Sequence, residues 1–206
     1  MSCEGEGLST DKYGVAQDPH CYPGTSTLIN RLGLMADDEL AEAERELTAI
    51  AADEIDFNPP PYSLDYLQSL HRYLFQDIYD WAGEIRTVDI SKDDTRFCTV
   101  TRIEAEAEKI FARLAQDRWL EHYERADLIA AVAEYYGDIN MLHPFREGNG
   151  SAQRLMFEHL IINAGYEISW WEVEPEVWRL GNIDAVACDY GRLEAIFDRC
   201  IGRRIQ

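Results

Sequence analysis

Apolar residues recur at helical spacing through most of the 206-residue chain, and the pattern changes to a two-residue period only once. Helical stretches run from about 37 to the prolines at 59–61, and over about 64–83, 103–114, 128–142, 150–163 and 192–201. After the second stretch, Val88 and Ile90 alternate with polar residues, so residues 86–98 are predicted to form a small hairpin turning around 92–94. One hairpin among helices predicts a mainly α fold.

The chain divides into a short tail and one folded unit. Residues 1–10 are polar and rich in glycine, and we expect a flexible N-terminal tail there. Residues 11–206 contain no internal repeat and no shift in composition that would mark a boundary, and they are numerous enough to bury one hydrophobic core. We therefore expect a single helical domain over 11–206, with the hairpin as its only β structure.

The charge balance excludes one large class of partner. Asp and Glu total 39 against 19 Lys and Arg, which gives a formal net charge of −20. A protein that binds nucleic acid gains much of its affinity by releasing counterions from a basic face, and this sequence has too few clustered cations to form one. We expect no direct contact with nucleic acid.

Cysteine usage and hydropathy bear on where the protein works. The five cysteines are widely spaced and form no CxxC pair, so we expect reduced thiols rather than a disulfide framework or a zinc site. The longest apolar runs, such as 128–133, are far shorter than the roughly 20 residues of a membrane helix. These observations predict a cytoplasmic protein without membrane contact.

Residues 143–154, His-Pro-Phe-Arg-Glu-Gly-Asn-Gly-Ser-Ala-Gln-Arg, lie between two helical patterns. Pro144 cannot continue a helix, so a loop begins there. Gly148, Asn149 and Gly150 allow successive backbone N–H groups to converge directly before the N-terminus of the next helix. Such an arrangement predicts a phosphate-binding site.

Three side chains of the same loop suit the chemistry of a nucleotide. Arg154 would lie one turn into the helix, where its guanidinium could bind a further phosphate through two hydrogen bonds. Glu147 supplies a carboxylate suited to a Mg²⁺ ion that bridges nucleotide phosphates. His143 can stay neutral near pH 7 and accept a proton from a hydroxyl group. The loop is not a P-loop, because the Gly-Lys-Ser/Thr ending is missing.

Other histidines and tryptophans have simpler explanations. His71 and His159 fall on apolar helical stripes, and we expect both to be buried, hydrogen-bonded structural residues. The tryptophans expected to serve as packing residues are Trp81, Trp170 and Trp171. For His143 a purely structural role is less convincing, because it would leave the neighbouring carboxylate, glycines and arginine unexplained.

The residues that resemble a known motif are His143, Phe145, Glu147, Gly148, Asn149, Gly150 and Arg154. In register, they closely resemble the Fic motif, HxFx(D/E)GNGxxxR. The upstream segment 80–92 resembles the helix end and the hairpin flap of the same family, and segments 18–25 and 163–170 resemble the bacterial Fic toxin subgroup. The resemblance covers nearly the whole chain from about Ser9 and implies a helical Fic-like domain.

The resemblance implies a protein adenylyltransferase, which transfers AMP from ATP to a hydroxyl side chain of another protein and releases pyrophosphate. It implies that His143 is the general base, that Glu147 holds Mg²⁺ and that Phe145 anchors the loop in the core. The Gly-Asn-Gly segment at 148–150 would bind phosphates, and Arg154 would bind the terminal phosphate of ATP.

The resemblance also implies how the target protein is bound. Residues 91–95 of the hairpin would bind a segment of the target by strand addition, and Lys92 and Asp93 at the turn would face the nucleotide. In the toxin subgroup the targets are subunits of type II topoisomerases. The implied partner is therefore a protein with an accessible Tyr, Ser or Thr hydroxyl, such as a subunit of DNA gyrase or topoisomerase IV.

Two departures from the family pattern bear on activity and regulation. Ser151 stands where the commonest form of the motif has arginine, so one phosphate contact is lost or replaced by a hydroxyl. The only match to the family's inhibitory signature, (S/T)xxxE(G/N), is at 2–7, in a Gly-rich segment of poor helix propensity. We therefore expect a separate small antitoxin protein rather than inhibition within the chain.

Two other functions stay open at this point. The Doc branch of the superfamily resembles this motif but transfers phosphate, and it has lysine at the position of Gly150, so the glycine favours AMP transfer. A catalytically silent binding module with the Fic fold is the second alternative. It is suggested by the missing arginine at Ser151 and by the strong acidity of the chain.

Overall fold

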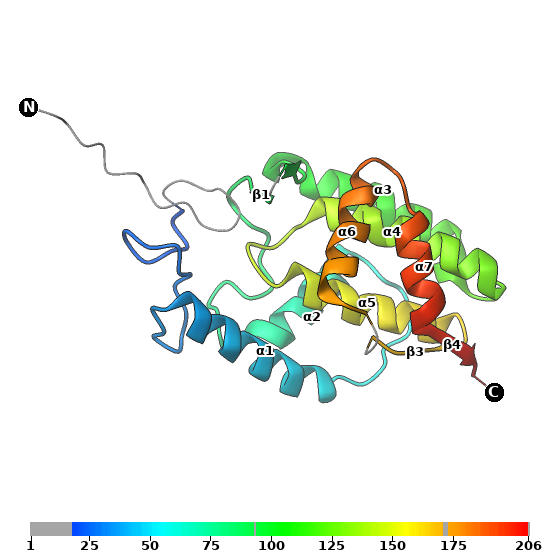
Figure 1. Cartoon of the computed structure of the whole chain (residues 1–206), viewed down its shortest axis with the longest axis horizontal. Coiled ribbons are helices and arrows are strands. Elements are labelled where there is room, and N and C mark those ends of the chain that lie inside the picture. Colours follow the sequence, from blue (N-terminus) through cyan, green and yellow to red (C-terminus); the bar gives the residue numbers. More distant parts are fainter. Residues whose placement is uncertain (1–17, 93, 171–172, 206) are drawn as a thin grey trace, which may run out of the picture.

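The computed structural model describes residues 18–92, 94–170 and 173–205, in which seven α-helices form most of the structure (Figure 1). The helices are α1 (Asp37–Asp53), α2 (Leu64–Phe75), α3 (Ile103–Gln116), α4 (Arg125–Leu142), α5 (Asn149–Asn163), α6 (Pro175–Val186) and α7 (Gly191–Cys200). Two antiparallel pairs join β1 (Ser91–Lys92) with β2 (Thr95–Arg96), and β3 (Tyr166–Ile168) with β4 (Ile201–Arg204). Short 3-10 turns, η1 (Val100–Arg102) and η2 (Arg118–Leu120), flank α3. The predicted mainly helical fold is confirmed.

Helix α5 lies in the middle of the molecule, with α2 and α4 packed against it (Figure 1). Its side chains are buried in several directions, and those of Met156, Phe157 and Leu160 are fully buried. Burying a side chain of this size contributes about 1.5–3 kcal/mol. The core therefore holds the N-terminus of α5, which follows the predicted phosphate-binding loop, in a defined place.

Helix α2 begins as predicted and ends earlier than predicted. Ser63 caps its N-terminus, because the side-chain oxygen accepts a hydrogen bond at 3.1 Å from the N–H three residues on. The helix ends at Phe75, whereas the apolar spacing predicted a helix to about Gly83. That expectation is wrong because the Gly83 N–H donates to Nδ1 of His71 at 2.8 Å, which brings the chain back against α2 in turns.

The predicted hairpin is present and short. Strands β1 and β2 contribute two residues each and pair in antiparallel register. Ile90 and Phe97 are buried together at its base in a small apolar cluster apart from the main core. Asp93, at the turn, lies outside the described residues. Residues 86–98 are called the flap below.

The C-terminal part contains two elements that the sequence analysis did not predict. Helix α6 begins with Pro175 and packs against α4 and α7. Strands β3 and β4 pair although they are far apart in sequence, with Ile168 opposite Ile201. The expectation that the hairpin is the only β structure is therefore wrong. This pairing depends on where α7 delivers the end of the chain, and it has no hairpin turn that the sequence could reveal.

Three predictions concern residues outside the described ranges, namely the flexible tail at 1–10, the signature match at 2–7 and the packing of Trp171. The extent of the single domain, 11–206, stays a prediction. Within the described ranges, no helix has both the length and the apolar character that crossing a lipid bilayer requires.

Candidate active site

A cavity of about 420 Å³ lies where the flap, the end of α4, the start of α5 and α6 meet. Its lining residues are Lys92, Thr95 and Phe97 from the flap, Tyr136, Asn140 and His143 from the end of α4, Glu147, Asn149, Gly150 and Arg154 from the next loop and α5, and Pro175, Trp178, Arg179, Asn182 and Ile183 from α6. Six of the predicted site residues are among them. The volume is that of a pocket for a small-molecule ligand.

Two predicted site residues are placed differently from this group. Gly148 does not line the cavity and has a φ of +78°, and a Cβ there would lie 2.4 Å from the ring of Phe75 on α2. Gly148 is therefore required for the backbone conformation of the loop and for its close approach to α2. Asp93 lies outside the described residues.

His143 ends α4 in the left-handed conformation, with φ 43° and ψ 61°, and its imidazole is buried. Nδ1 of the ring lies 3.2 Å from the carbonyl oxygen of Asn140. A carbonyl only accepts hydrogen bonds, so Nδ1 carries the hydrogen and the lone pair of the neutral ring is on Nε2. Nε2 is therefore the atom that can take up a proton.

The pKa of His143 is lowered to about 4, chiefly because burial disfavours the charged ring. A backbone hydrogen bond and the charge of Glu147 raise this pKa in part, whereas Arg86 and Lys92 lower it. From the flap, Phe97 covers one face of the imidazole, with ring centroids 3.8 Å apart. The ring of His143 is therefore neutral at pH 7.

The loop between α4 and α5 is closed by the side chain of Asn149. Its Oδ1 accepts the N–H of Phe145 at 2.8 Å, and its Nδ2 donates to the carbonyl of Phe145 at 2.8 Å. Phe145 is fully buried, in agreement with the expected anchoring of the loop in the core. The Asn149 side chain thus stabilises the conformation of the loop. The groups of this segment that can bind an anion are the backbone N–H groups in the first turn of α5.

A second buried histidine supports the loop from α2. Nδ1 of His71 accepts the N–H of Gly83, so the ring hydrogen is on Nε2, which lies 2.9 Å from the carbonyl oxygen of Glu147. The ring stacks on Phe145 with centroids 3.9 Å apart, and burial lowers the pKa of His71 to about 4. The prediction of a hydrogen-bonded structural histidine is confirmed for His71.

His159 and two of the tryptophans also have the structural roles predicted for them. Nδ1 of His159 forms a hydrogen bond with the hydroxyl of Tyr66, and burial lowers the pKa of His159. Trp81 and Trp170 are partly buried and pack against the main core. None of these side chains lines the 420 Å³ cavity.

Glu147 is the carboxylate of the cavity. Its Oε1 accepts the N–H of Gly148 at 3.1 Å. Among the described residues, no three His, Cys, Asp or Glu side chains converge in a way that could hold a metal by protein ligands. Mg²⁺ is commonly bound by one or two carboxylates together with substrate phosphates and water. A single carboxylate beside a helix N-terminus therefore fits a Mg²⁺ ion that arrives with a nucleotide.

Arg154 lies one turn into α5, and one of its guanidinium nitrogens is 3.4 Å from Oγ of Ser151. Arg154 lines the cavity and also a second groove of about 330 Å³ between α1 and α5, together with Arg45 and Ser151. Ser151, at the usual arginine position of the motif, lines only the second of these two hollows. Arg154 is thus the arginine of α5 that reaches the cavity.

Arg146 is the loop residue for which the sequence predicted no role. Its side chain is 2% exposed and forms an ion pair with Asp18, which is equally buried. Burial lowers the pKa of Arg146 to about 10, which leaves it charged at neutral pH. The backbone N–H and Nδ1 of His20 each lie 2.9 Å from Oδ1 of Asp18. The pair joins the N-terminal segment at 18–25 to the loop.

Helix α6 forms the wall of the cavity that the sequence analysis missed. Trp178 packs edge-on against Tyr136, with ring centroids 5.0 Å apart. Nδ2 of Asn182 donates to the carbonyl of Trp178 at 2.9 Å. Within the described ranges its buried Oδ1 has no hydrogen-bond partner, so this atom can accept a hydrogen bond from a ligand. Aromatic and amide groups in one wall suit a nucleobase.

Comparison with known proteins shows which family this chain resembles over nearly its full length. Residues 61–161 match the Fic/DOC family. The chain is 41% identical over 192 residues to "Probable protein adenylyltransferase Fic" of Escherichia coli K12, which covers 93% of this chain and 96% of that protein. It is 33% identical over 190 residues to "Protein adenylyltransferase VbhT" of Bartonella schoenbuchensis, which covers 91% of this chain and 40% of that protein.

A solved structure shows the same architecture. It is the N-terminal Fic domain of a VirB-translocated effector protein from Bartonella quintana with bound ADP, and it matches this chain with a TM-score of 0.82 at 26% identity. The match covers 91% of this chain and 95% of that one. With the motif in register, the fold in common and a relative of 41% identity over nearly the full length, this chain belongs to the Fic/DOC family.

Proposed function

We propose that this chain binds ATP in the 420 Å³ cavity and transfers AMP to a hydroxyl side chain of a protein. The observation that carries the proposal is that His143, Glu147 and Arg154 line one cavity together with the first turn of α5. These residues supply a base, a carboxylate for Mg²⁺ and a cation for phosphate, which are the groups that the reaction needs. The relatives named above as protein adenylyltransferases, and the ADP in the related structure, support it.

His143 acts as the general base in this reaction. The ring is neutral at pH 7, and Nε2 accepts the proton of the target hydroxyl. The hydroxyl oxygen forms a bond to the α-phosphorus of ATP while the bond to the bridging oxygen breaks, and pyrophosphate leaves with the electron pair. For substitution at phosphorus, most of the acceleration comes from alignment and charge stabilisation.

The first turn of α5 and Arg154 bind the phosphates. Among the described residues, a Cβ at Gly150 would meet only Nη1 of Arg154, at 3.3 Å, so the glycine leaves room beside the arginine for the outer phosphates. Glu147 would hold Mg²⁺, which when bound neutralises phosphate charge. The room at Gly150 supports AMP transfer over the Doc-type reaction, in which a lysine fills this position.

The α6 wall binds the nucleobase. The indole of Trp178 offers an apolar surface, and Oδ1 of Asn182 offers an acceptor for an exocyclic amino group. The sugar and the phosphates then extend from α6 toward Arg154, because both lie along the same cavity.

The flap presents the target. A segment of the target protein adds as a strand to the β1–β2 hairpin, and main-chain hydrogen bonds hold it there without a strict sequence requirement. Lys92 lines the cavity, and we place it and Asp93 close to the nucleotide phosphates in this complex.

We further propose that the protein works in the cytoplasm as a toxin-like enzyme under the control of a small antitoxin protein. A subunit of DNA gyrase or topoisomerase IV is the target class. Enzymes that handle DNA carry basic surfaces, and the net charge of −20 would speed encounter with such a surface. A transfer rate that does not fall with added salt would contradict this electrostatic part of the proposal.

The test uses the purified chain, Mg²⁺ and ATP labelled at either the α- or the γ-phosphate, with topoisomerase subunits as acceptors. AMP transfer labels the acceptor only from α-labelled ATP, whereas Doc-type transfer labels it only from γ-labelled ATP. His143→Ala should abolish labelling, and His122→Ala, at an exposed histidine away from the motif loop, should leave it intact. Equal labelling by wild type and His143→Ala would exclude the mechanism, and no labelling by wild type would favour a silent binding module.

A further inference from the structure

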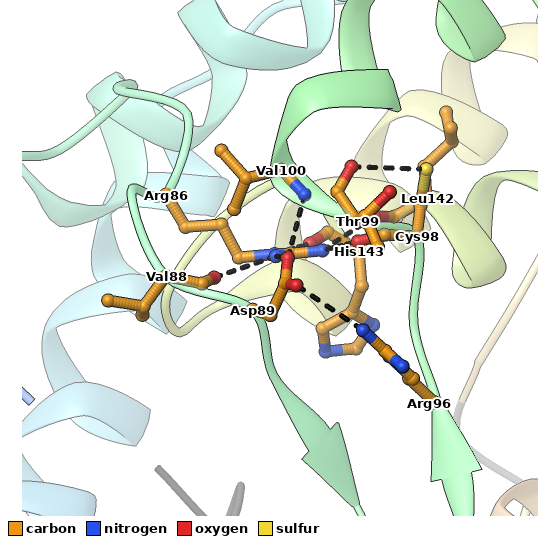
Figure 2. Close-up of polar contacts among 9 residues, drawn as sticks. All are labelled: Arg86, Val88, Asp89, Arg96, Cys98, Thr99, Val100, Leu142 and His143. Carbon is orange, nitrogen blue, oxygen red and sulfur yellow. Dashed lines mark hydrogen bonds and ion pairs between the residues drawn. The ribbon is translucent and has the colours of Figure 1, made fainter. Parts of the chain in front are cut away.

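Arg86 is a buried arginine between the flap and the loop that carries His143. The residue is 2% exposed and lies at the base of the flap. Figure 2 shows its guanidinium among backbone carbonyl groups of the flap and of the end of α4. Arg86 does not line the 420 Å³ cavity.

The guanidinium is hydrogen-bonded to both parts at once. Nε donates to the carbonyl of His143 at 2.8 Å, and Nη2 lies 3.5 Å from the carbonyl of Leu142. On the flap side, Nη1 donates to the carbonyl of Val88 at 2.7 Å, and Nη2 donates to the carbonyl of Cys98 (Figure 2). One side chain therefore joins both ends of the flap to the last turn of α4.

Two backbone hydrogen bonds reinforce this connection. The N–H of Arg86 donates to the carbonyl of Pro144 at 2.9 Å, and the N–H of Cys98 donates to the carbonyl of Met141 at 2.9 Å. With the side-chain contacts, all four successive carbonyls from 141 to 144 are engaged by the two ends of the flap.

These carbonyls need a partner for a physical reason. The last carbonyls of a helix have no partner within the helix and carry partial negative charge, which a cation stabilises. The left-handed backbone of His143 is also unfavourable for a residue with a side chain, and the Arg86 Nε contact holds the carbonyl of that residue in place. The position of the imidazole thus depends on Arg86.

The geometry requires a planar guanidinium rather than any cation. Asp89 is the carboxylate next to Arg86, at 3.8 Å, and its half-exposed side chain also faces Arg96. Most partners of Arg86 are therefore neutral carbonyls that lie in several directions. Lysine keeps the charge but has a single nitrogen, so it cannot reach the carbonyls of the flap and of α4 together.

The flap residue next to this contact is the one that covers the imidazole. Phe97 precedes Cys98 and stacks on His143 with ring planes 16° from parallel. Arg86 therefore holds both members of the stack, His143 through its own carbonyl and Phe97 through the carbonyl of the adjacent residue.

We propose that Arg86 is a positioning residue that sets the place of the flap relative to Nε2 of His143. The inference rests on the proposed function, in which the flap presents the target hydroxyl to that nitrogen. Loss of the guanidinium should misplace the target relative to the base. It should weaken nucleotide binding much less, because Arg154, the first turn of α5 and the α6 wall lie outside the flap.

The test compares Arg86→Lys with a matched control, Arg125→Lys. Arg125 also binds backbone carbonyls at a helix C-terminus, those of Asp198 and Ile201 at 2.7 and 2.8 Å, but at α7, away from the flap. Hydrogen exchange is measured at the amides of Phe97 and Cys98. We expect exchange at these amides to become at least fivefold faster in Arg86→Lys and to stay unchanged in the control. A smaller increase in folded Arg86→Lys would overturn the proposal.

Activity measurements separate positioning from general damage. In Arg86→Lys we expect kcat for the protein target to fall at least tenfold, because a shift of about 1 Å can cost a hundredfold. The Kd for AMPPNP with Mg²⁺ should rise by no more than about threefold, because most of the cavity lining lies outside the flap. A loss of AMPPNP affinity equal to the loss of rate would overturn the proposal. If wild type transfers no AMP, the proposed function fails while the exchange measurement still shows whether Arg86 holds the flap.

Asp89→Ala tests the same connection from the flap side without opening the core. Its Oδ1 accepts the N–H of Val100 at 2.8 Å and lies beside Arg86. We expect faster exchange at Phe97 and Cys98 as well as at Val100. Faster exchange confined to Val100 would contradict the proposal, and this variant decides the question if Arg86→Lys does not fold.

Discussion

The imidazole of His143 lies flat against the ring of Phe97, with centroids 3.8 Å apart and planes 16° from parallel. Phe97 belongs to the flap and His143 ends α4, so the stack joins the same two parts that Arg86 connects. The stack removes water from one face of the imidazole and so contributes to the burial that lowers the pKa of His143. The flap therefore affects the protonation of His143, in addition to the target binding that we propose for it.

Phe97→Ala is expected to raise the pKa of His143 from about 4 toward 6.5, because water then reaches the exposed face of the ring. Titration of the imidazole by NMR measures this directly. Phe97→Leu keeps most of the apolar cover and is the control, with a pKa closer to that of wild type. An unchanged pKa in Phe97→Ala would show that the flap does not contribute to the burial of the ring.

Mild acid is expected to destabilise the fold through His71 and His143. Both have a pKa of about 4 in the folded state against 6.5 as the ordinary value. Between these values the unfolded chain binds more protons, so the free energy of unfolding is complete above pH 6.5 and falls as the pH falls toward 4. Each histidine contributes at most about 3 kcal/mol to this loss.

Urea unfolding at several pH values between 7.5 and 4.5 checks this dependence. Carboxylates also titrate at the lower end of the range, so the informative quantity is the difference between wild type and His71→Asn. The variant should lose less stability on acidification than wild type does. Equal losses would show that His71 is protonated as readily in the folded as in the unfolded state.

Alanine at Gly148 is expected to destabilise the fold, and alanine at Gly150 is not. At Gly148 the new Cβ would lie 2.4 Å from Phe75, and the φ of +78° is unfavourable for alanine, so a loss of about 2 kcal/mol or more is expected. Gly150 is already helical, and within the described part of the chain its Cβ would meet only Nη1 of Arg154. Stability should therefore be unchanged or raised by up to about 1 kcal/mol. Urea unfolding compares the free energies of unfolding of the two alanine variants. Equal losses would contradict the conclusion that Gly148, and not Gly150, is required by the fold.

Asp18→Asn is expected to destabilise the protein strongly. It removes the carboxylate that forms the buried ion pair with Arg146, and breaking a buried pair by removing one partner typically costs about 3–5 kcal/mol. Asp138→Asn is the control, because its pair with Arg113 is partly exposed and should contribute less than about 1 kcal/mol. Similar losses in the two variants would mean that the 18–25 segment does not depend on this ion pair.

Ser151→Arg is expected to raise kcat/KM for ATP about tenfold, through one added charge-assisted hydrogen bond to phosphate. Oγ of Ser151 lies 3.4 Å from Nη2 of Arg154, so the introduced arginine side chain would lie next to Arg154, which lines the cavity. Ser151→Gln adds a polar side chain without charge and is the control. An equal gain in both variants would argue against a phosphate contact, and a wild type without activity would favour the binding module.

Local signals predicted the parts of the fold that neighbouring residues decide. The cap at Ser63 and the start of α1 at Asp37 were found because a helix terminus is set by the few residues around it. His143, Glu147 and Arg154 could be grouped because one loop and one helical turn bring them together. The end of α2 was misplaced, since the apolar spacing continues to Trp81 while a tertiary hydrogen bond to His71 turns the chain earlier.

The sequence by itself determined that the chain is helical and that His143, Glu147 and a Gly-Asn-Gly segment lie together in one loop. Only the tertiary structure decided what holds that loop, because Arg86 meets His143 across 57 positions and Arg146 meets Asp18 across 128. The placement of α6 over the cavity is of the same kind. The hydrophobic effect is non-directional, and the entropic cost of closing a loop grows slowly with loop length. Apolar periodicity therefore shows which face of a helix is buried, but it does not show which other element packs against that face.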